Sequence, residues 1–156
     1  MSKLFSEITI GQLKLDNRIV VPPMCQYSAV SGQASEWHLM HYGNLALSGT
    51  GLLIFEATGV APEGWISFAD LGWKPDRYIA PDAPNGWQTF APSAEPLTTG
   101  GTIPKELSRD EIKAIVRQFA QAAKRAVDIG FNLVELHAAY GYLMHQFFLL
   151  LPSSTE

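Results

Sequence analysis

The spacing of apolar residues between positions 18 and 58 constrains the fold of this chain more than any other feature. Residues 18–22 (RIVVP) and 51–58 (GLLIFEAT) are apolar runs without polar alternation, which is typical of strands buried on both faces. Residues 36–48, between these runs, carry apolar side chains at helical spacing and end before Gly49. A strand, a helix and a second strand with short connections predict a βαβ unit, and therefore a parallel sheet.

A second helix and a third strand are predicted further along the chain. Ser108 with Glu111 three residues later is a capping-box sequence, and Gly130 stands where a C-cap glycine is expected. Between them one apolar stripe recurs at helical spacing, made of Ile112, Ile115, Val116, Phe119, Ala122, Ala123, Ala126 and Val127. This helix leads directly into residues 131–136 (FNLVEL), which we predict to form a third buried strand that ends at His137.

Two other segments are distinctive. Residues 8–15 (ITIGQLKL) alternate apolar and polar residues around Gly11-Gln12, which predicts a short hairpin. Residues 61–107 hold most of the prolines and many of the glycines, and their pattern predicts no strand. An irregular stretch of this length inside a compact domain indicates either a functional excursion or the loss of sequence.

The predicted fold class is α/β. Parallel strands that alternate with helices form doubly wound sheets or (β/α)8 TIM barrels, and both place their sites at the carboxyl ends of the strands. No G-x-G-x-x-G motif follows any predicted strand, which favours the barrel. A complete barrel takes about 250 residues, whereas this chain has 156. We therefore expect residues 1–156 to form one domain with an incomplete barrel.

Composition narrows the classes of partner and site. The chain is 47% hydrophobic and 17% charged with a net charge of −4, and no block of like charge predicts a nucleic-acid or membrane-surface partner. Cys25 is the single cysteine, which excludes an internal disulfide and a Cys-based zinc site. No apolar segment of a secretory signal or a membrane span is present, so we expect a cytoplasmic protein.

Residues that follow the first two predicted strands are candidates for ligand contact. Pro23 stiffens the backbone after the first predicted strand. Met24 and Cys25 offer soft sulfur contacts suited to a flat aromatic ligand. The alternative for these two side chains is that they fill the core. Tyr27 offers a phenol to a ligand or to its own loop. Ala57 lets a ligand approach the backbone closely, or is part of a plain turn.

The third predicted strand is followed by His137, Tyr140 and Tyr142. An imidazole and a phenol both donate hydrogen bonds to a carbonyl oxygen, and donors aimed at an oxygen that gains charge accelerate a reaction. A second phenol supplies a proton. The alternative is a histidine bonded to a backbone carbonyl, with tyrosines that pack a loop. Three residues of this kind at one strand end favour function.

The other histidines predict no metal site. His38 and His41 are three residues apart on the first predicted helix, but no neighbouring residues complete a ligand set and the H-E-x-x-H order is absent. We expect both side chains to be solvated, and we expect the same of His145.

Four segments of the chain resemble one family. They are residues 13–27, which include the motif PPMCQY, and residues 36–64, 79–96 and 107–148, which include the pattern E-L-H-x-x-x-G-Y. These residues are similar to the old yellow enzymes, FMN-dependent ene-reductases on a (β/α)8 barrel. Within this family the chain most resembles the subgroup that includes the bacterial xenobiotic reductases and the thermophilic-like members. The resemblance implies FMN as cofactor, NADPH or NADH as reductant, and activated alkenes as small-molecule substrates.

The resemblance also implies roles for the residues that match the family's cofactor site. Pro23, Met24 and Ala57 correspond to positions that border the flavin, largely through backbone atoms. Cys25 corresponds to the thiol beside the isoalloxazine, where it adjusts the redox behaviour of the ring.

Further roles follow for the substrate side. Tyr27 corresponds to a tyrosine that lines the substrate pocket, and His137 to a residue that binds the carbonyl or nitro oxygen of the substrate. Tyr142 corresponds to the tyrosine that delivers a proton to the α-carbon. Tyr140 stands where the family has a histidine or an asparagine as the second oxygen-binding residue.

The chain departs from the family in two further ways. Residues 70–81 (DLGWKPDRYIAP) join regions that are separate in the family, so we expect the third barrel strand and its flavin-binding glutamine to be missing. The chain also stops soon after residues 146–150, so the C-terminal half of the barrel is expected to be absent. The departures leave two interpretations. One is a shortened enzyme that assembles as a homo-oligomer, and the other is an inactive homologue that serves as a structural or interaction fragment.

Overall fold

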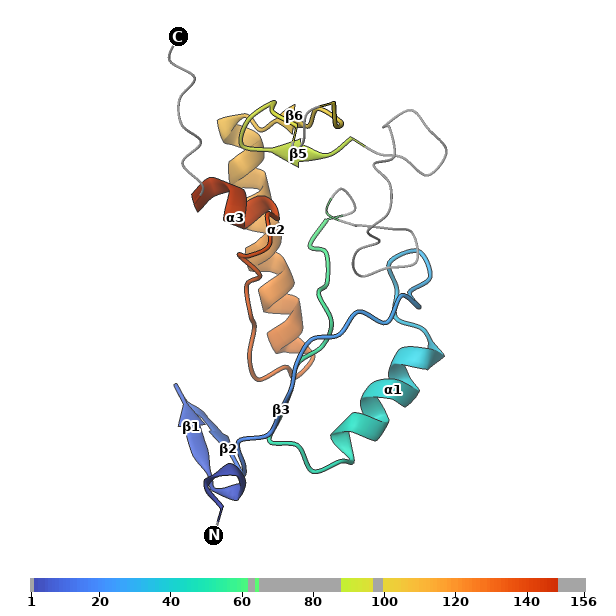
Figure 1. Ribbon diagram of the computed structural model, residues 1–156, viewed down its shortest axis with the longest axis vertical. Coiled ribbons are helices and arrows are strands. Elements are labelled where there is room, and N and C mark those ends of the chain that lie inside the picture. Colours follow the sequence, from blue (N-terminus) through green and yellow to red (C-terminus); the bar gives the residue numbers. More distant parts are fainter. Residues whose placement is uncertain (1, 62–63, 65–87, 97–99, 149–156) are drawn as a thin grey trace. The chain divides into compact units, whose positions relative to one another are not determined.

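A computed structural model of the protein describes residues 2–61, 64, 88–96 and 100–148 (Figure 1). The chain divides into two compact units. Unit 1 consists of Met1–Pro75 with Gly130–Leu133, and unit 2 consists of Asp76–Ile129 with Val134–Glu156. The junction of residues 70–81, where we expect a missing strand, lies outside the described residues.

Unit 1 begins with a short 3-10 helix and a hairpin. The 3-10 helix η1 spans Lys3–Phe5, and the antiparallel strands β1 (Ile8–Ile10) and β2 (Leu13–Leu15) follow it. Gly11, between the strands, has a φ of +59°, a left-handed conformation that glycine adopts without steric cost. The predicted hairpin is therefore confirmed, and Leu15 at its end is buried.

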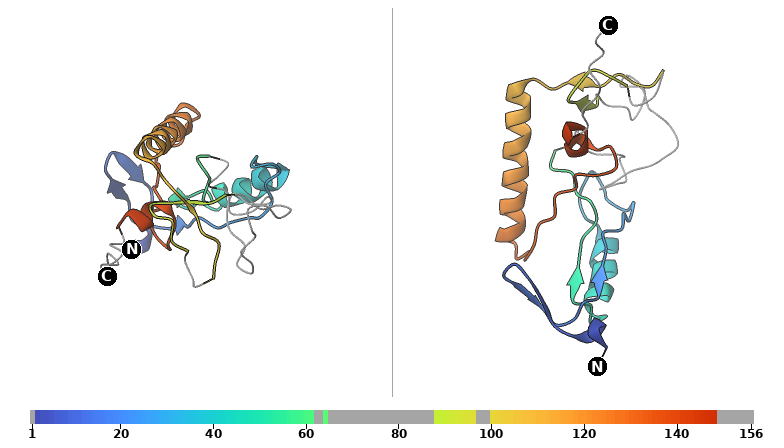
Figure 2. Two further views of the ribbon diagram at one scale, coloured as in Figure 1. Left: turned by 90° about the horizontal axis from the view of Figure 1, so that it is seen from above. Right: turned by 60° about the vertical axis from the view of Figure 1, so that its left-hand side comes forward.

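The predicted βαβ unit is also confirmed. Strand β3 (Val20–Val21), helix α1 (Glu36–Ala46) and strand β4 (Leu52–Leu53) follow one another, and β3 and β4 pair in parallel. In the right-hand view of Figure 2 the two strands lie side by side with α1 next to them. Parallel pairing places the carboxyl ends of both strands at the same edge.

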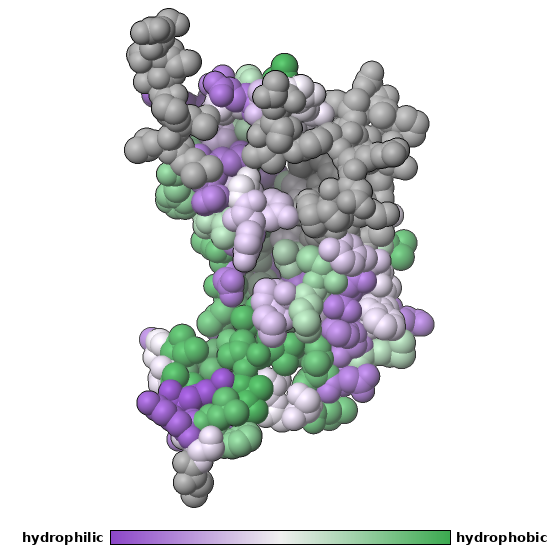
Figure 3. Space-filling view, viewed as in Figure 1, coloured by the Kyte–Doolittle hydropathy of each residue, from purple (hydrophilic) through white to green (hydrophobic). Residues whose placement is uncertain are grey.

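The two strands are shorter and more exposed than the sequence predicts. Each has two residues, and Val20 is 44% exposed, so the expectation of strands buried on both faces is wrong here. Among the described residues the β3–β4 sheet has no third strand, which leaves apolar side chains uncovered. Figure 3 shows hydrophobic surface gathered where the hairpin and these strands lie.

A close backbone approach fixes the start of the parallel pair. A Cβ atom on Gly51 would lie 2.2 Å from the backbone oxygen of Asn17, so only glycine fits at this position. The Asn17 side chain donates to the Gly49 carbonyl over 2.9 Å and accepts from the Ile19 N–H over 3.0 Å. The same asparagine therefore holds the beginnings of both strands.

Helix α2 (Arg109–Asp128) dominates unit 2 and begins and ends as predicted. The Ser108 hydroxyl accepts from the Glu111 N–H, and the Glu111 carboxylate accepts from the Ser108 N–H over 2.9 Å, which completes the capping box. Hydrogen bonds from Lys105 and then from Ser108 lower the pKa of Glu111 to about 2. Gly130, just past the helix, has a φ of +101°, so the predicted C-cap glycine is confirmed.

Two predictions about strands are wrong. Strands β5 (Phe90–Ala91) and β6 (Lys105–Glu106) pair in parallel within a region where the pattern indicated none. Residues 131–136 form no strand and pair with none of the described strands. Pairs of two residues are too short to leave a periodic signal, and an apolar run becomes a strand only when a neighbouring backbone completes its hydrogen bonds.

The apolar stripe of α2 has a partner inside unit 2. The short helix α3 (Leu143–Phe148), which the sequence pattern did not indicate, forms with α2 an apolar groove of about 360 Å³. Residues that line it include Ile112, Val116, Phe119, Leu143 and Phe147. No residue of α2 is fully buried, so this helix is amphipathic without a closed core beneath it. None of the described helices is long and apolar enough to cross a membrane.

The described strands do not close a barrel. They form three separate sheets of two strands, β1–β2, β3–β4 and β5–β6. The parallel β3–β4 pair with its connecting helix is the part of the predicted α/β architecture that the described residues contain.

The capping box predicts how the stability of α2 responds to mutation. Ser108→Ala removes the hydroxyl that satisfies the Glu111 N–H, and we expect a loss of about 1 kcal/mol in the free energy of unfolding. Urea unfolding followed by far-ultraviolet circular dichroism measures this loss. Gln121→Ala, at an exposed position of the same helix, is the matched control and should change the value by less than about 0.5 kcal/mol. Equal effects of the two substitutions would contradict the role of the cap.

Candidate functional site

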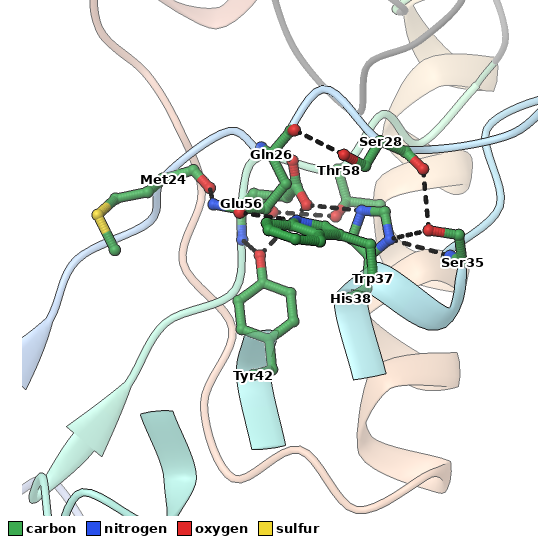
Figure 4. Close-up of polar contacts among 9 residues, drawn as sticks. All are labelled: Met24, Gln26, Ser28, Ser35, Trp37, His38, Tyr42, Glu56 and Thr58. Carbon is green, nitrogen blue, oxygen red and sulfur yellow. Dashed lines mark hydrogen bonds and ion pairs between the residues drawn. The ribbon is translucent and has the colours of Figure 1, made fainter. Parts of the chain in front are cut away.

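A buried carboxylate lies where β3 and β4 end. Glu56 follows β4 and is only 3% exposed. Its Oε2 accepts a hydrogen bond from the Gln26 backbone N–H over 2.8 Å, and its Oε1 accepts from the Tyr42 hydroxyl over 3.2 Å. His38 Nε2 lies 3.0 Å from the same Oε1 (Figure 4). Three elements therefore meet at one carboxylate, since Gln26 follows β3 and the other two residues belong to α1.

Tyr42 is bound to Glu56 twice. Its hydroxyl donates to the carboxylate and accepts from the Glu56 backbone N–H over 3.0 Å. Its ring stacks on Phe55 with centroids 4.0 Å apart. Burial, more than any other cause, raises the pKa of Tyr42 to about 12, and the neighbouring carboxylate adds to the effect because it disfavours a phenolate. The phenol therefore remains a hydrogen-bond donor at neutral pH.

His38 is 4% exposed, so the expectation of a solvated histidine is wrong. Its Nδ1 accepts from the Ser35 backbone N–H over 2.9 Å, which places the proton of a neutral imidazole on Nε2, toward Glu56. Nε2 lies within ion-pair distance of Glu56 Oε1 but makes no well-aligned hydrogen bond among the described residues. The spacing of His38 and Tyr42 places them on one face of α1. With the carboxylate that follows β4, this spacing was the signal in the sequence for a buried cluster.

His41 and His145 are half-buried, so the expectation that they are solvated is wrong. His41 stacks on Trp37 with ring centroids 6.1 Å apart and meets the Tyr42 ring edge-on at 5.1 Å. His145 accepts from the Gly141 N–H over 2.8 Å through its Nδ1. The described residues contain no group of three His, Cys, Asp or Glu side chains that could hold a metal ion.

The side chain of Gln26 ties the segment after β3 to α1. Its Nε2 donates to the Met24 carbonyl over 2.7 Å, and its Oε1 accepts from the Trp37 indole N–H over 3.1 Å. The Ser28 hydroxyl donates to the Gln26 carbonyl over 2.9 Å, and the Ser35 hydroxyl donates to the Ser28 carbonyl over 3.0 Å. Figure 4 shows these contacts as one connected network around Glu56. Helix α1 thereby holds the loop of residues 24–28.

The residues predicted to border a flavin lie on both sides of this network. Pro23, Met24 and Ala57 are exposed, and Cys25 is half-buried. Met24 is 42% exposed and extends away from Glu56 and Tyr42 in Figure 4, which argues against the alternative that it fills the core. The Gln26–Glu56 hydrogen bond joins residues that directly follow Cys25 and precede Ala57, so the structure brings these two segments together.

This surface fits a flat aromatic group that carries polar atoms at its edge. Exposed apolar side chains offer contact to a ring face, and the N–H groups of Met24 and Ala57 donate no hydrogen bond among the described residues. Unused backbone donors beside apolar surface suit a heteroaromatic ligand such as a flavin. Tyr27, half-exposed in the same segment, has a φ of +52°. A left-handed conformation is uncommon for tyrosine.

The second set of predicted residues lies together in unit 2. The His137 ring stacks on Tyr140 with centroids 5.8 Å apart and lies 5.2 Å from the Tyr142 ring. Tyr140 is 88% exposed, with a φ of +57°, and Gly141 follows with a φ of +80°. This sharp turn presents one imidazole and two phenols as a cluster. The strand that was expected to carry them is absent from residues 131–136.

Comparison with known proteins assigns the chain to a family. A sequence model of the NADH:flavin oxidoreductase / NADH oxidase family matches residues 3–76 and 65–154. The chain belongs to this family. Its two matched stretches overlap at residues 65–76, which include the first part of the junction (residues 70–81) where we expect family regions to be missing.

Curated relatives and solved structures agree with this assignment. The NADPH dehydrogenases of Listeria monocytogenes serotype 4a (strain HCC23) and Bacillus subtilis (strain 168) are 41% and 37% identical to this chain. The alignments cover 94% and 93% of this chain and 51% of each relative. A morphinone reductase in complex with tetrahydroNAD has a TM-score of 0.76 and 27% identity, over 94% of this chain and 52% of its own. The Old Yellow Enzyme from Pichia sp. AKU4542 has a TM-score of 0.78 and 26% identity, over 95% of this chain and 49% of its own.

These matches place the chain among the old yellow enzymes, as the sequence motifs imply. The chain spans about half the length of the curated relatives it matches. The family assignment therefore concerns the segments that this chain contains, among them the segments after β3 and β4.

The raised pKa of Tyr42 predicts a loss of stability at high pH. The folded protein keeps the phenol proton up to about pH 12, while the unfolded chain releases it near pH 10. The contribution of this proton to stability is therefore complete below pH 10 and is lost as the pH rises to about 12. Near neutral pH, Tyr42→Phe should cost about 1–3 kcal/mol, because it leaves buried groups of Glu56 without a partner.

Urea unfolding of both proteins over a range of pH measures this effect. We expect the wild type to be more stable than Tyr42→Phe at neutral pH and the difference to shrink between pH 10 and 12. The difference between the free energies of unfolding of the two proteins cancels the contribution of the other residues that titrate at alkaline pH. A difference that stays constant through this range would show that the hydroxyl of Tyr42 is not held as a protonated donor.

Proposed function

We propose that the protein acts as an FMN-dependent NAD(P)H oxidoreductase that reduces activated alkenes, such as α,β-unsaturated carbonyl compounds. One structural observation carries the proposal. The segments after β3 and β4 meet at Glu56 and leave exposed apolar side chains beside the N–H groups of Met24 and Ala57, which donate no hydrogen bond within the described part of the chain. Sites of (β/α)8 enzymes lie at the carboxyl ends of parallel strands. The family assignment and the names of the relatives support the same activity.

The flavin would lie against the residues after β3 and β4. Pro23, Met24 and Ala57 would contact the ring through apolar atoms and backbone N–H groups, and the Cys25 thiol would lie beside it and adjust its redox behaviour. When bound, FMN supplies the redox chemistry, since it accepts a hydride from NADPH or NADH and passes it to the alkene. The protein holds and orients the ring.

The cluster of unit 2 would bind the substrate. The His137 imidazole and the Tyr140 phenol donate hydrogen bonds to the carbonyl oxygen, which polarises the conjugated double bond. The Tyr142 hydroxyl supplies the proton that the α-carbon takes up. Tyr27 contributes a wall of the substrate pocket. Tyr140 replaces a shorter side chain of the family, and its exposed position leaves its hydroxyl available to a ligand.

The predicted flavin contact is tested at Met24. Met24→Glu places a charge where the apolar face of a ring would lie, and we expect FMN affinity to fall by at least about ten-fold, because a charge that is covered without a partner is costly. Titration of the purified protein with FMN, followed by flavin absorbance and fluorescence, measures the dissociation constant. Met40→Glu, at an exposed methionine of α1, is the matched control and should bind FMN like the wild type.

The outcome of this titration also separates the two interpretations of the chain. Bound flavin with steady NADPH oxidation coupled to reduction of cyclohexenone supports the enzyme. A wild-type protein that gains no flavin absorbance would defeat the proposal for this chain and favour a structural or interaction fragment. We also propose that the protein forms a homo-oligomer, which its mass in solution tests.

The proton-delivery role is tested at Tyr142. Tyr142→Phe removes the acidic hydroxyl, and we expect the oxidative half-reaction with an alkene to slow by about 100-fold, a usual contribution of general acid catalysis. Reduction of the flavin by NADPH should change little, because it needs no proton from this residue. Rapid-mixing measurements of each half-reaction give both rates. Equal slowing of both half-reactions would argue against the role of Tyr142.

The substrate class has a neighbouring alternative. A nitro group carries oxygen atoms that accept hydrogen bonds from His137 and Tyr140 as a carbonyl oxygen does. Reduction of nitro compounds or quinones would therefore use the same donors. A comparison of rates for cyclohexenone, a nitroaromatic compound and a quinone identifies the preferred class.

A further inference from the structure

The backbone hydrogen bonds of the β3–β4 sheet end before the two segments that follow these strands and form the candidate site. The last backbone hydrogen bond of the β3–β4 pair joins the Ile54 N–H to the Val21 carbonyl over 3.0 Å. Beyond it no backbone hydrogen bond links the two segments among the described residues. The next link is made by a side chain, the carboxylate of Glu56, which accepts from the Gln26 N–H over 2.8 Å.

The position of this carboxylate is fixed from the opposite side by α1. Tyr42 and His38 contact Oε1, while Oε2 remains for the Gln26 N–H. Glu56 is 3% exposed, and a buried carboxylate is stable only when donors compensate for the water it has lost. Donors on both oxygens leave the carboxylate one orientation. The link to Gln26 therefore has a defined length and direction.

Gln26 transmits this constraint to the residues before it. Its backbone N–H is bound by Glu56, and its side chain binds the Met24 carbonyl over 2.7 Å and the Trp37 indole over 3.1 Å. Residues 24–26 are thus held by Glu56 and by Trp37, while the side chain of Met24 remains 42% exposed. A side-chain link also differs from a sheet ladder, because it leaves the N–H groups of Met24 and Ala57 without a partner among the described residues.

We propose that Glu56 is a positioning residue that fixes the loop of Met24 and Cys25 through the backbone N–H of Gln26, with His38 and Tyr42 orienting its carboxylate. The further statement that this loop contacts FMN depends on the proposed function. The statement that Glu56 fixes the loop does not depend on the proposed function, so the two statements are tested separately.

The first experiment measures the loop without any flavin. Cys25 is the single cysteine of the chain and directly precedes Gln26, so the rate of its reaction with a maleimide reports on this loop alone. We expect Glu56→Ala to raise the labelling rate by about ten-fold, the ratio that corresponds to the loss of one hydrogen bond to a charged group. Glu56→Gln should raise it by only about two- to three-fold, because the amide oxygen still accepts from the Gln26 N–H.

Two controls separate a local effect from a general loss of stability. Glu36→Gln removes an exposed carboxylate of α1 and should leave the labelling rate unchanged. Leu15→Ala creates a cavity at a buried hairpin residue and destabilises the protein away from the loop. Urea concentrations are chosen so that Leu15→Ala and Glu56→Ala have equal free energies of unfolding. Faster labelling in Glu56→Ala alone supports the proposal, and equal labelling in the two variants overturns it.

The second experiment adds FMN. We expect Glu56→Ala to weaken FMN binding by about ten-fold, with partial recovery in Glu56→Gln and none of the loss in Glu36→Gln. Faster Cys25 labelling in Glu56→Ala, combined with no FMN binding by the wild type, would support the positioning role and defeat the proposed function. FMN binding by the wild type, combined with wild-type labelling and affinity in Glu56→Ala, would overturn the positioning role and leave the proposed function in place.

Discussion

The contact between the Glu56 carboxylate and the Gln26 backbone N–H is the interaction on which the candidate flavin site depends. The strands that lead to it have two residues each, so the sheet itself supplies few hydrogen bonds. The carboxylate extends the link beyond the end of the sheet. Removal of a charged group from water is costly, and this cost explains why two side chains of α1 contact the same carboxylate. The helix is therefore part of the site, although it contributes no residue to the predicted flavin contacts.

The two units show how differently helices and strands depend on their surroundings. Helix α2 spans 20 residues although none of its side chains is fully buried, because its capping box and its internal hydrogen bonds are local. Residues 131–136 have the apolar composition of a strand but form none in the described part of the chain. A strand leaves its backbone groups unpaired until another strand lies beside it. The relatives, about twice as long as this chain, contain sequence that this chain does not.

The candidate site was predictable to different degrees. Motifs identified Met24, Cys25, His137 and the tyrosines near it, and the structure places His137, Tyr140 and Tyr142 in one cluster. The supporting residues were missed. Each of them is ordinary in its own segment, since Glu56 follows an apolar run and His38 lies among mixed apolar and polar residues on α1. Only their meeting in space shows that the histidine is buried against the carboxylate.

The sequence by itself determined the helices α1 and α2, the hairpin, the order of strand, helix and strand, and the family. These depend on caps, turn residues and spacing, which act between residues that are close in the chain. Tertiary structure decided which apolar runs became strands, how much of each side chain was covered, and that His38, Tyr42 and Gln26 converge on Glu56. The physical reason is that burial and hydrogen-bond partners come from distant parts of the chain, up to 30 positions apart for Gln26 and Glu56. The local spacing of His38 and Tyr42 places them on one face of α1, but it does not record the carboxylate and the backbone N–H that they meet.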